Sequence, residues 1–438
     1  MPDDVLTIAD RLWRGETTTG TFHPVEHIGG FVEITDGVGF APSFANVSAF
    51  DTDDGLLLVD TGSLPLARVV HDDIRRWSPS RLHTAVYSHG HIDHVFGVPV
   101  WEEEAAEKGW AAPEVIAHHA LPARFDRYIF TAGYNTVINR RQFGFKDLNW
   151  PTEYRYPDRT YHDTLDLSVG GIDFALRHEK GETDDHTVTW QADTKVLCCG
   201  DLFIWASPNA GNPQKVQRYP REWAQALRRM LLLEAEFLLP GHGFPVMGAE
   251  RVRQALTDTA DLLDSLVDQT LAVMNSGGRL TDAIHSVKAP AALEDRPYLR
   301  PVYDEPEFVV HTVWRQYGGW WDGNPATLKP APERALAREL AELAGGAGAL
   351  AGRALELLAL AEGVGDTPEA DHALRLAGHL AESAWLAAPG DPAIQEARHD
   401  VFAARAGRAT STMARGVFTW ASNESAPGPG EDAAPHPH

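Results

Sequence analysis

The chain has 438 residues, of which 43% are hydrophobic and 23% are charged, as in ordinary globular proteins. This length allows about two or three domains and a core of useful size. The 38 Lys and Arg residues against 62 Asp and Glu residues give a formal net charge of −24. That charge argues against nucleic acid or an anionic membrane as a partner, because both require a basic patch, but a local pocket could still bind a small anionic substrate.

Cysteine usage and the N-terminal sequence bear on location. Cys198 and Cys199 are adjacent, so no disulfide framework is possible. The N-terminal residues lack the basic segment and apolar core of a signal peptide. The chain has no uncharged apolar run of about 20 residues that could span a membrane. We therefore expect a cytoplasmic protein with no membrane partner.

The first half of the chain alternates strand patterns with helix patterns. Apolar residues at helical spacing predict helices over Ala67–Trp77 and Arg221–Leu233. Strands are predicted at Phe31–Ile34, Phe44–Phe50, Gly55–Asp60, Thr84–Ser88, Gly171–Arg177, Thr187–Gln191, Lys195–Cys199 and Glu236–Leu239. This alternation favours a layered α/β domain.

The pattern changes after about residue 250. Apolar residues at helical spacing predict one long amphipathic helix over Arg251–Met274. From Pro330 onward the chain is rich in Ala, Leu and Glu and is interrupted by glycines, which is typical of successive helices. We expect an α/β domain over residues 1–265, a helical domain over residues 266–424, and a disordered Pro/Gly/Ala tail over residues 425–438.

The strongest motif follows the predicted strand Thr84–Ser88. Four side chains that can bind metal lie within six residues, namely His89, His91, Asp93 and His94. Imidazole and carboxylate groups are zinc ligands, and a loop at a strand end can direct alternate side chains at one point. His89 and His91 could bind one ion, and Asp93 with His94 a second. The alternative is a surface histidine cluster without function, which this order and placement disfavour.

Three further motifs stand beside predicted strands. They are Gly181-Glu182-Thr183, Cys199-Gly200-Asp201 and Pro240-Gly241-His242-Gly243. Taken singly, each is typical of a turn or a helix cap. In this order after the histidine cluster, they favour a metal site.

These motifs together resemble the metallo-β-lactamase superfamily, with its order H-x-H-x-D-H, Gly-x-Thr, Gly-Asp and Pro-Gly-His-Gly. The resemblance implies an α/β fold, a four-layer αββα sandwich with two zinc ions between the sheet edges. Asp60-Thr61-Gly62 matches the early Asp-Thr-Gly turn of that superfamily. In that turn the Asp supports the metal ligands from behind.

Two features resemble the alkylsulfatase branch, the zinc-dependent type III sulfatases, more narrowly. Glu182 stands where most of the superfamily has His, and Trp320–Pro325 is similar to the branch hallmark G-W-F-D-G-N-P. The resemblance implies an all-α dimerisation domain after the sandwich, and a homodimer formed through it. Asp201 stands where the branch usually has Glu, and no sterol-carrier-like domain follows the helical region, so we do not expect long-chain, detergent-like substrates.

Carried over residue by residue, the resemblance implies two zinc ions (Zn2+) per chain. The ligands would be His89, His91 and Glu182 for one ion, Asp93, His94 and His242 for the other, and Asp201 as the bridge between them. His186 and His178 flank Glu182. Each is either a substitute for that ligand, His186 first, or a hydrogen-bonded neighbour of the site.

The implied reaction is the hydrolysis of an alkyl or aryl sulfate monoester of modest size. Two zinc ions lower the pKa of a bridging water toward neutrality, so a metal-bound hydroxide could attack the sulfur or the ester carbon. Arg218 is the first candidate to bind the anionic oxygens, because its fork matches two oxygens at once, and with Asp93 and Asp201 it forms the predicted catalytic set. Further candidates, each also explicable as a solvated surface group, are Lys215, Arg140, Arg141 and Asn212.

Two questions stay open at this stage. The aromatic residues between the ligand motifs could line a substrate pocket or simply pack in the core, and they are Phe125, Tyr128, Phe130, Tyr134, Trp150, Tyr154, Tyr156 and Trp205. Asp201 also leaves room for hydrolysis of another ester-like bond, such as a lactone, thioester, β-lactam or phosphoester. A metal-free binding module is a third hypothesis, which the complete ligand set disfavours.

Overall fold

A computed structural model of the chain describes residues 4–26 and 28–426. Two compact units make up the fold. Of the described residues, the first contains 4–26, 28–132 and 151–320, and the second contains 133–150 and 321–426. The domain boundaries expected from the sequence stay a prediction, and the expected disordered tail lies, from residue 427 on, outside the described residues.

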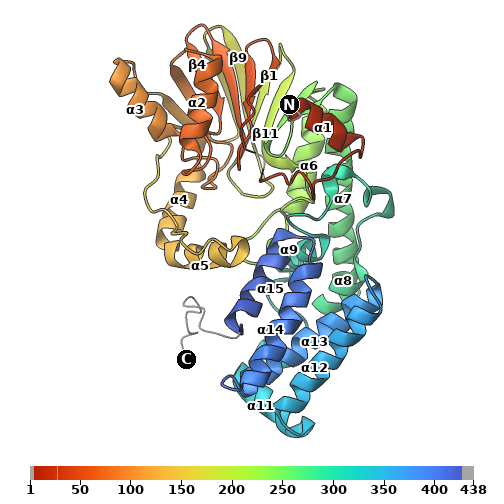
Figure 1. The fold of residues 1–438 in the computed structure, drawn as a ribbon. Helices are drawn as coiled ribbons and strands as arrows, with labels where there is room; N and C mark the ends of the chain where they lie inside the picture. The colour runs from red at the N-terminus through yellow and green to blue at the C-terminus, as the bar shows by residue number, and fades with distance from the viewer. Residues whose placement is uncertain (1–3, 27, 427–438) are drawn as a thin grey trace. The chain divides into compact units, whose positions relative to one another are not determined.

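Two β-sheets form the centre of the first unit (Figure 1). One has seven strands in chain order: β1 (Val32–Thr35), β2 (Val38–Ala41), β3 (Val47–Thr52), β4 (Gly55–Val59), β5 (Leu82–Val86), β6 (Glu114–His118) and β7 (Arg159–Tyr161). The other has six strands in the spatial order β13 (Val246–Met247), β12 (Phe237–His242), β11 (Val196–Ile204), β10 (His186–Gln191), β9 (Ile172–Glu179) and β8 (Thr164–Val169).

The two sheets pack face to face, and helices cover their outer faces. Phe50 of β3 and Phe174 of β9 meet edge to face between the sheets, with ring centroids 5.0 Å apart. Trp101 of α3 (Val98–Lys108) lies in the cluster outside the first sheet, and Trp223 of α6 (Pro220–Leu231) lies over the second. Each fully buried large apolar side chain contributes about 1.5–3 kcal/mol. The four-layer sandwich predicted from the sequence is therefore confirmed.

The helices of the first unit precede, connect and follow these strands. They are α1 (Val5–Trp13), α2 (Ala67–Trp77), α3 (Val98–Lys108), α4 (Leu121–Phe130), α6 (Pro220–Leu231), α7 (Ala249–Asn275), α8 (Leu280–Ser286) and α9 (Pro306–Gly318), with short 3-10 turns η1 (Ala291–Leu293) and η2 (Pro297–Leu299). Helix α2 has the bounds that its apolar spacing predicts.

Strand β11 differs from its prediction. The sequence predicts that it ends at Cys199, but the strand continues to Ile204, because β12 pairs with it in parallel as far as Ile204 and His242. The register shifts at Gly200, whose φ of 49° favours glycine. Asp201 therefore lies within an irregular strand and not in a turn.

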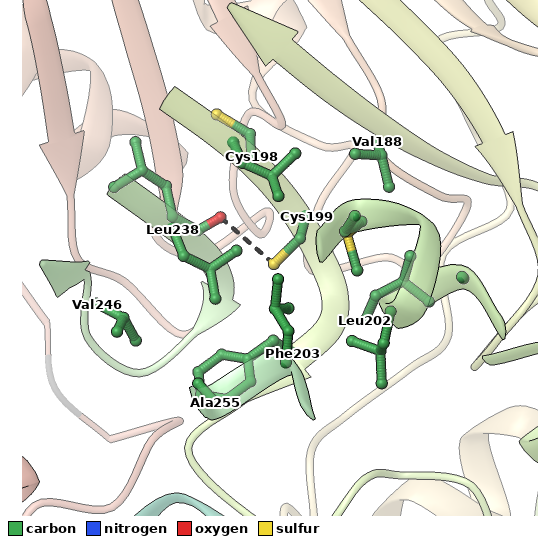
Figure 2. Packing of buried hydrophobic residues seen from close by; sticks show 14 of the residues in the cluster. Val188, Cys198, Cys199, Leu202, Phe203, Leu238, Val246 and Ala255 are labelled. Carbon is green, nitrogen blue, oxygen red and sulfur yellow. Dashed lines mark hydrogen bonds between the residues drawn. The ribbon is translucent and has the colours of Figure 1, made fainter. Parts of the chain in front are cut away.

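Two thiols lie on β11 in the core of the second sheet. Figure 2 shows Cys198 and Cys199 among Val188, Leu202 and other apolar residues. Cys199 Sγ lies 3.8 Å from the carbonyl oxygen of Leu239 on β12. Both cysteines are free and buried, in agreement with the absence of a disulfide framework.

The second unit is helical. Its helices are α5 (Ala132–Phe143), α10 (Pro325–Leu328), α11 (Glu333–Ala344), α12 (Ala347–Gly363), α13 (Pro368–Ala387), α14 (Pro392–Arg408) and α15 (Thr412–Glu424). Small residues such as Ala354, Ala361 and Ala377 are fully buried where α12 and α13 meet, which allows close packing. The helical region expected after the sandwich is confirmed.

Among the described helices, none alone has the length and apolar composition needed to cross a membrane. Helices α11 and α12 meet that test only as a pair, and the pair is bent by 83°. The cellular location expected from the sequence stays a prediction.

Candidate metal centre

The histidine motif occupies the loop that follows β5. His89 and His94 are fully buried, whereas 18% of the His91 side chain is exposed. His89 Nε2 lies 2.8 Å from His91 Nδ1, and the rings of His89 and His94 have centroids 4.2 Å apart. The loop thus directs these side chains at one region, as the strand-end placement predicts.

All seven predicted ligand side chains gather in two neighbouring groups. The ligand atoms within each group all lie within 4.8 Å of one another, and the groups are His89, His91, Glu182 and Asp201, and Asp93, His94 and His242. Glu182 comes from the turn between β9 and β10, Asp201 from β11 and His242 from the end of β12. The structure therefore brings together residues that are up to 153 positions apart (242 − 89).

Asp201 faces both groups. Its Oδ2 lies 3.7 Å from His89 Nε2 of the first group and 3.2 Å from His242 Nε2 of the second, and its Oδ1 lies 3.5 Å from His94 Nε2. A carboxylate in this position can contact two cations at once. This is the arrangement that the predicted bridging role requires.

Several buried polar atoms of the site have no hydrogen-bond partner among the described residues. They are Glu182 Oε2, Asp201 Oδ1 and His94 Nε2. Buried polar atoms without a partner are rare in proteins because they are costly. Divalent cations bound in the two groups would satisfy all three, and the imidazole and carboxylate donors match those that zinc prefers. The residues therefore fit a metal site.

The pKa shifts at the site follow from burial and close charges. Burial holds the pKa values of His89 and His91 well below their usual range, which keeps these imidazoles neutral, the form that binds metal. Burial opposes a charge on His242, but the carboxylates of Asp201 and Asp93 outweigh it and raise the His242 pKa to about 10. A cation binding between these carboxylates would compete with the His242 proton.

Asp60 contacts the ligand His94 on the side of its ring that faces away from the site. This is the supporting role that the Asp-Thr-Gly turn predicts. Asp60 Oδ2 lies 2.7 Å from His94 Nδ1, and the two Asp60 oxygens accept hydrogen bonds from Ser88 N–H and Oγ–H, both at 2.7 Å. On the other side, His242 Nδ1 donates to the carbonyl oxygen of Phe44. Such contacts fix the ring orientation, so that Nε2 of each histidine points to the site.

Arg218 reaches the first ligand group and pairs with Glu182. Its Nη1 lies 2.8 Å from Glu182 Oε1 and donates to the Glu182 carbonyl oxygen at 2.7 Å. Asn209 Nδ2 donates to the same carboxylate. Arg218 is only 3% exposed, and its Nε is buried without a partner among the described residues. Burial raises the pKa of Glu182 to about 8, although the Arg218 charge opposes this shift.

The other predicted anion-binding residues are divided between the two units. Burial and the neighbouring Arg218 charge lower the pKa of Lys215 to about 7, and Asp93 and Glu182 act on it in the opposite direction, so Lys215 lies near both ligand groups. Asn212 is buried in the same loop, and its Oδ1 accepts from Gln214 N–H at 3.1 Å.

Arg140 and Arg141 belong to α5 in the second unit. Arg140 Nε donates to the carbonyl oxygen of Leu148 at 2.7 Å, and the Arg141 guanidinium lies 5.8 Å from the ring centroid of Trp420. Neither contact involves a predicted ligand.

His186 and His178 belong to neither ligand group. His186 Nε2 lies 3.0 Å from the carbonyl oxygen of Cys199, and its ring stacks on His89 with centroids 4.9 Å apart. His178 Nε2 lies 2.9 Å from the carbonyl oxygen of Asp184, and its ring stacks on His118 at 3.6 Å. Both histidines are hydrogen-bonded neighbours, one of the two alternatives that the sequence left open.

The aromatic candidates have different environments. Trp205 packs in the core, where its Nε1–H donates to the carbonyl oxygen of Phe244 at 2.6 Å. Phe125 is fully buried and stacks on Tyr154 at 4.5 Å. Tyr154 lines a groove of about 520 Å³ beside Val95 and Phe96, immediately after the histidine motif. Phe130 is 90% exposed.

Two residues outside the sequence motifs, Arg124 and Asp185, hold the ligand loops together. Arg124 of α4 is 4% exposed and pairs through Nε with Asp185 Oδ1 at 3.0 Å. The other Asp185 oxygen accepts from the N–H of Gly90, which lies between His89 and His91. No local motif marks either residue, because their roles depend on contacts between distant segments.

Two known families match different parts of the chain, one the α/β region and one the helical region. Residues 41–242 match the model described as Metallo-beta-lactamase superfamily, and residues 279–428 match the model described as Alkyl sulfatase dimerisation. The superfamily match and the cluster of His and Asp side chains together indicate metal binding.

Curated relatives are named alkylsulfatases. A linear primary-alkylsulfatase of Pseudomonas sp. (strain ATCC 19151) is 29% identical over 315 residues, which cover 67% of this chain and 59% of that protein. An alkyl/aryl-sulfatase of Saccharomyces cerevisiae is 26% identical over 378 residues, which cover 80% of this chain and 57% of that protein. The chain thus spans less than two thirds of the length of these relatives.

A solved structure shares the fold. The stereoselective inverting sec-alkylsulfatase from Pseudomonas sp. superimposes with a TM-score of 0.81 at 22% identity, over 92% of this chain and 66% of that chain. The chain therefore joins a domain of the metallo-beta-lactamase superfamily to an alkyl sulfatase dimerisation domain, and its curated homologues are alkylsulfatases.

Proposed function

We propose that the chain is a dinuclear zinc hydrolase that cleaves an alkyl or aryl sulfate monoester. The observation that carries the proposal is Asp201, which faces the two ligand groups at 3.2–3.7 Å and so can join two cations. The alkylsulfatase names of the relatives supply the substrate class. In this proposal each group of ligands holds one ion, with two ions per chain.

The residues around the ligands have complementary roles in this proposal. When bound, the two zinc ions supply a hydroxide nucleophile at neutral pH. Arg218 offers a buried guanidinium beside Glu182, with Nε unsatisfied among the described residues, and a guanidinium can bind two sulfate oxygens at once. Lys215, whose pKa of about 7 leaves its amine partly protonated at neutral pH, adds a partial positive charge near both groups. Hydrolysis then adds the elements of water to the ester and releases an alcohol and inorganic sulfate.

The proposal also includes a homodimer formed through the helical region. The match of residues 279–428 to the dimerisation model supports it. Sedimentation velocity at micromolar concentration should give twice the monomer mass of 48.0 kDa. A monomer under these conditions would contradict the dimer.

Sulfate release tests the activity directly. Zinc-loaded protein should release inorganic sulfate, measured by ion chromatography, from a panel of alkyl and aryl sulfates, and the same samples should contain about two zinc ions per chain. His91→Ala should abolish release. His372→Ala is the matched control, because His372 is exposed on α13 in the other unit, and it should leave release unchanged.

One observation favours a second candidate function. Asp201 is the residue found at the bridging position across the wider superfamily, so the site could hydrolyse a lactone, thioester, β-lactam or phosphoester instead. The same protein should be assayed on these compounds. Activity on them, with no sulfate from any ester of the panel, would replace the sulfatase proposal.

A further inference from the structure

Four histidines outside the two ligand groups gather beside strands β6, β7 and β9. They are His118 at the end of β6, His119 after it, His162 after β7 and His178 on β9. The rings of His118 and His178 stack face to face, with centroids 3.6 Å apart and an angle of 3° between their planes. The rings of His119 and His162 meet at 3.9 Å. Because β6 and β9 belong to different sheets, the first stack joins the two sheets.

The hydrogen bonds of His118 favour its neutral ring. The residue is only 2% exposed. Its Nδ1 accepts from Ala120 N–H at 3.4 Å, so the proton of the neutral ring lies on Nε2, which can donate to His119 Nδ1 at 2.9 Å. A second proton would bind at Nδ1 and would face the Ala120 N–H, donor against donor. Protonation of His118 therefore removes a contact that holds the ring in place.

The groups around His118 also oppose a second proton. They face it from β9, from β7 and from neighbouring turns, and are His178, Tyr161, His119, His162 and Asp185. Burial is the largest influence, and with His178 and His119 it lowers the His118 pKa from 6.5 to about 4, although Asp185 and the His162 backbone act in the opposite direction. An opened chain binds this proton more readily than the closed stack, so acid favours opening.

The stack continues into the turn after β9, which carries one of the predicted ligands. His178 Nε2 lies 2.9 Å from the carbonyl oxygen of Asp184 and donates to it. The next carboxylate, that of Asp185, accepts from Gly90 N–H in the histidine loop at 3.0 Å. Asp184 and Asp185 both pair with Arg124. Displacement of His178 would therefore act on this turn and, through it, on the histidine loop.

We propose that these four histidines form an acid-sensitive contact: protonation of His118 separates its ring from His178, the turn over residues 180–185 loosens, and the metal centre releases its ions faster. The effect on the ions rests on the proposed dinuclear centre, whereas the opening of the stack does not. Metal-free protein therefore tests the contact itself, and zinc-loaded protein tests its effect on the site.

Hydrogen exchange of the metal-free protein, corrected for the intrinsic effect of pH, measures the opening. With a His118 pKa of about 4 in the stack against 6.5 in the open chain, opening should rise about 20-fold from about pH 7 to about pH 5. The rise should appear in residues 117–124 and 179–187. Strand β3 in the same sandwich is the internal reference and should rise far less.

Two substitutions remove the titrating ring in different ways. His118→Asn keeps an acceptor for the Ala120 N–H, and His118→Phe keeps an aromatic ring against His178. In either variant the acid-induced rise should be at least about fivefold smaller than in the parent, and one folded variant of the two is enough. His285→Asn is the matched control, because His285 is exposed on α8 in the same unit, and it should keep the rise of the parent.

Zinc-loaded protein gives the second measurement, the rate at which zinc is lost to an excess of chelator at the same two pH values. Protonation of the ligands themselves speeds this loss in every variant. The additional opening in the parent should make its acceleration by acid about 20-fold larger than that of His118→Asn.

The outcomes separate this inference from the proposed function. An equal rise of hydrogen exchange in the parent, His118→Asn and His118→Phe would overturn the role of His118. A rise that stays within residues 117–124, or that is as large in β3, would overturn the link to the ligand turn, as would equal acceleration of zinc loss in parent and variant. If the protein binds no zinc, the proposed function fails, and hydrogen exchange still decides whether the stack opens in acid.

Discussion

Arg124 and Asp185 form a buried ion pair, with 3.0 Å between Nε and Oδ1, and only 4% and 0% of their side chains exposed. The second oxygen of Asp185 holds the Gly90 N–H between His89 and His91. The pair therefore joins α4, the turn after Glu182 and the histidine loop. Removal of the Asp185 charge would leave the buried Arg124 with only the half-exposed Asp184 as an ion-pair partner.

Asp185→Asn should lower the free energy of unfolding by about 3–5 kcal/mol, the usual cost of breaking a buried ion pair on one side. Urea denaturation at neutral pH measures this. Asp184→Asn is the matched control, because Asp184 pairs with the same guanidinium but is 45% exposed, and it should cost at most about 1 kcal/mol. An equal loss of unfolding free energy in the two variants would show that burial does not make the Asp185 pair more stabilising than the Asp184 pair.

Asp60→Asn should weaken zinc binding about 10- to 100-fold, because it removes the carboxylate that orients His94. Competition against a chelator of known affinity measures the change. Ser88→Ala removes a neighbouring partner of Asp60 but leaves the contact with His94, so a smaller effect is expected. Unchanged zinc affinity in Asp60→Asn would contradict the supporting role.

Gly241→Ala should displace the bridging carboxylate. A Cβ at this position would lie 2.1 Å from Asp201 Oδ1, closer than real side chains approach, and at a tight 3.0 Å from His94 Cε1. A displacement of about 1 Å can cost about 100-fold in rate, so sulfate release should fall by about that factor and zinc content should drop below that of the parent. Gly133→Ala in α5 has open space around it and should change neither quantity.

Acid should weaken a salt-bridged cluster on the first unit. Burial opposes the charge of Glu104, but hydrogen bonds from Arg75 at 2.6 Å and Lys108 at 2.8 Å outweigh it and lower the Glu104 pKa from 4.5 to about 2. Because the folded value is the lower one, the ionised carboxylate stabilises the fold above pH 4.5, and this contribution is lost as the pH falls toward about 2.

The expected signature of Glu104→Gln is a loss of stability at about pH 7 that shrinks at about pH 3. Denaturation at both pH values measures it. Glu103→Gln serves as control, because Glu103 is 64% exposed and pairs with the exposed Arg68; its effect should stay below about 1 kcal/mol throughout. A constant loss across the pH range for Glu104→Gln would refute the assigned shift.

The sequence predicts the ligands far better than it predicts their supports. His89 to His94 are neighbours in the chain, and Glu182, Asp201 and His242 stand in short motifs whose order is informative. Arg124 and Asp185 have no such motif, since they act through a contact between segments that are 61 residues apart.

In the fold, too, elements set by local sequence are predicted and elements set by contacts with distant strands are not. Helix α2 and the apolar strand β4 follow from local periodicity. The extension of β11 to Ile204 does not, because pairing with β12 decides it and the Gly200–Asp201 pair is locally typical of a turn. Strand β8 was also missed, although its exposed and buried positions alternate, since polar residues occupy half of it.

The adjacent thiols of β11 can report the opening of this strand, because their reaction with an alkylating reagent requires it. Burial raises the pKa of Cys198 to about 12 and that of Cys199 well above its usual range. Alkylating reagents attack the thiolate, so the native strand should be almost inert to them. Modification can then occur only when β11 opens. The rate at which the protein gains alkyl mass therefore measures how often β11, the strand that holds Asp201, opens. No engineered label is needed.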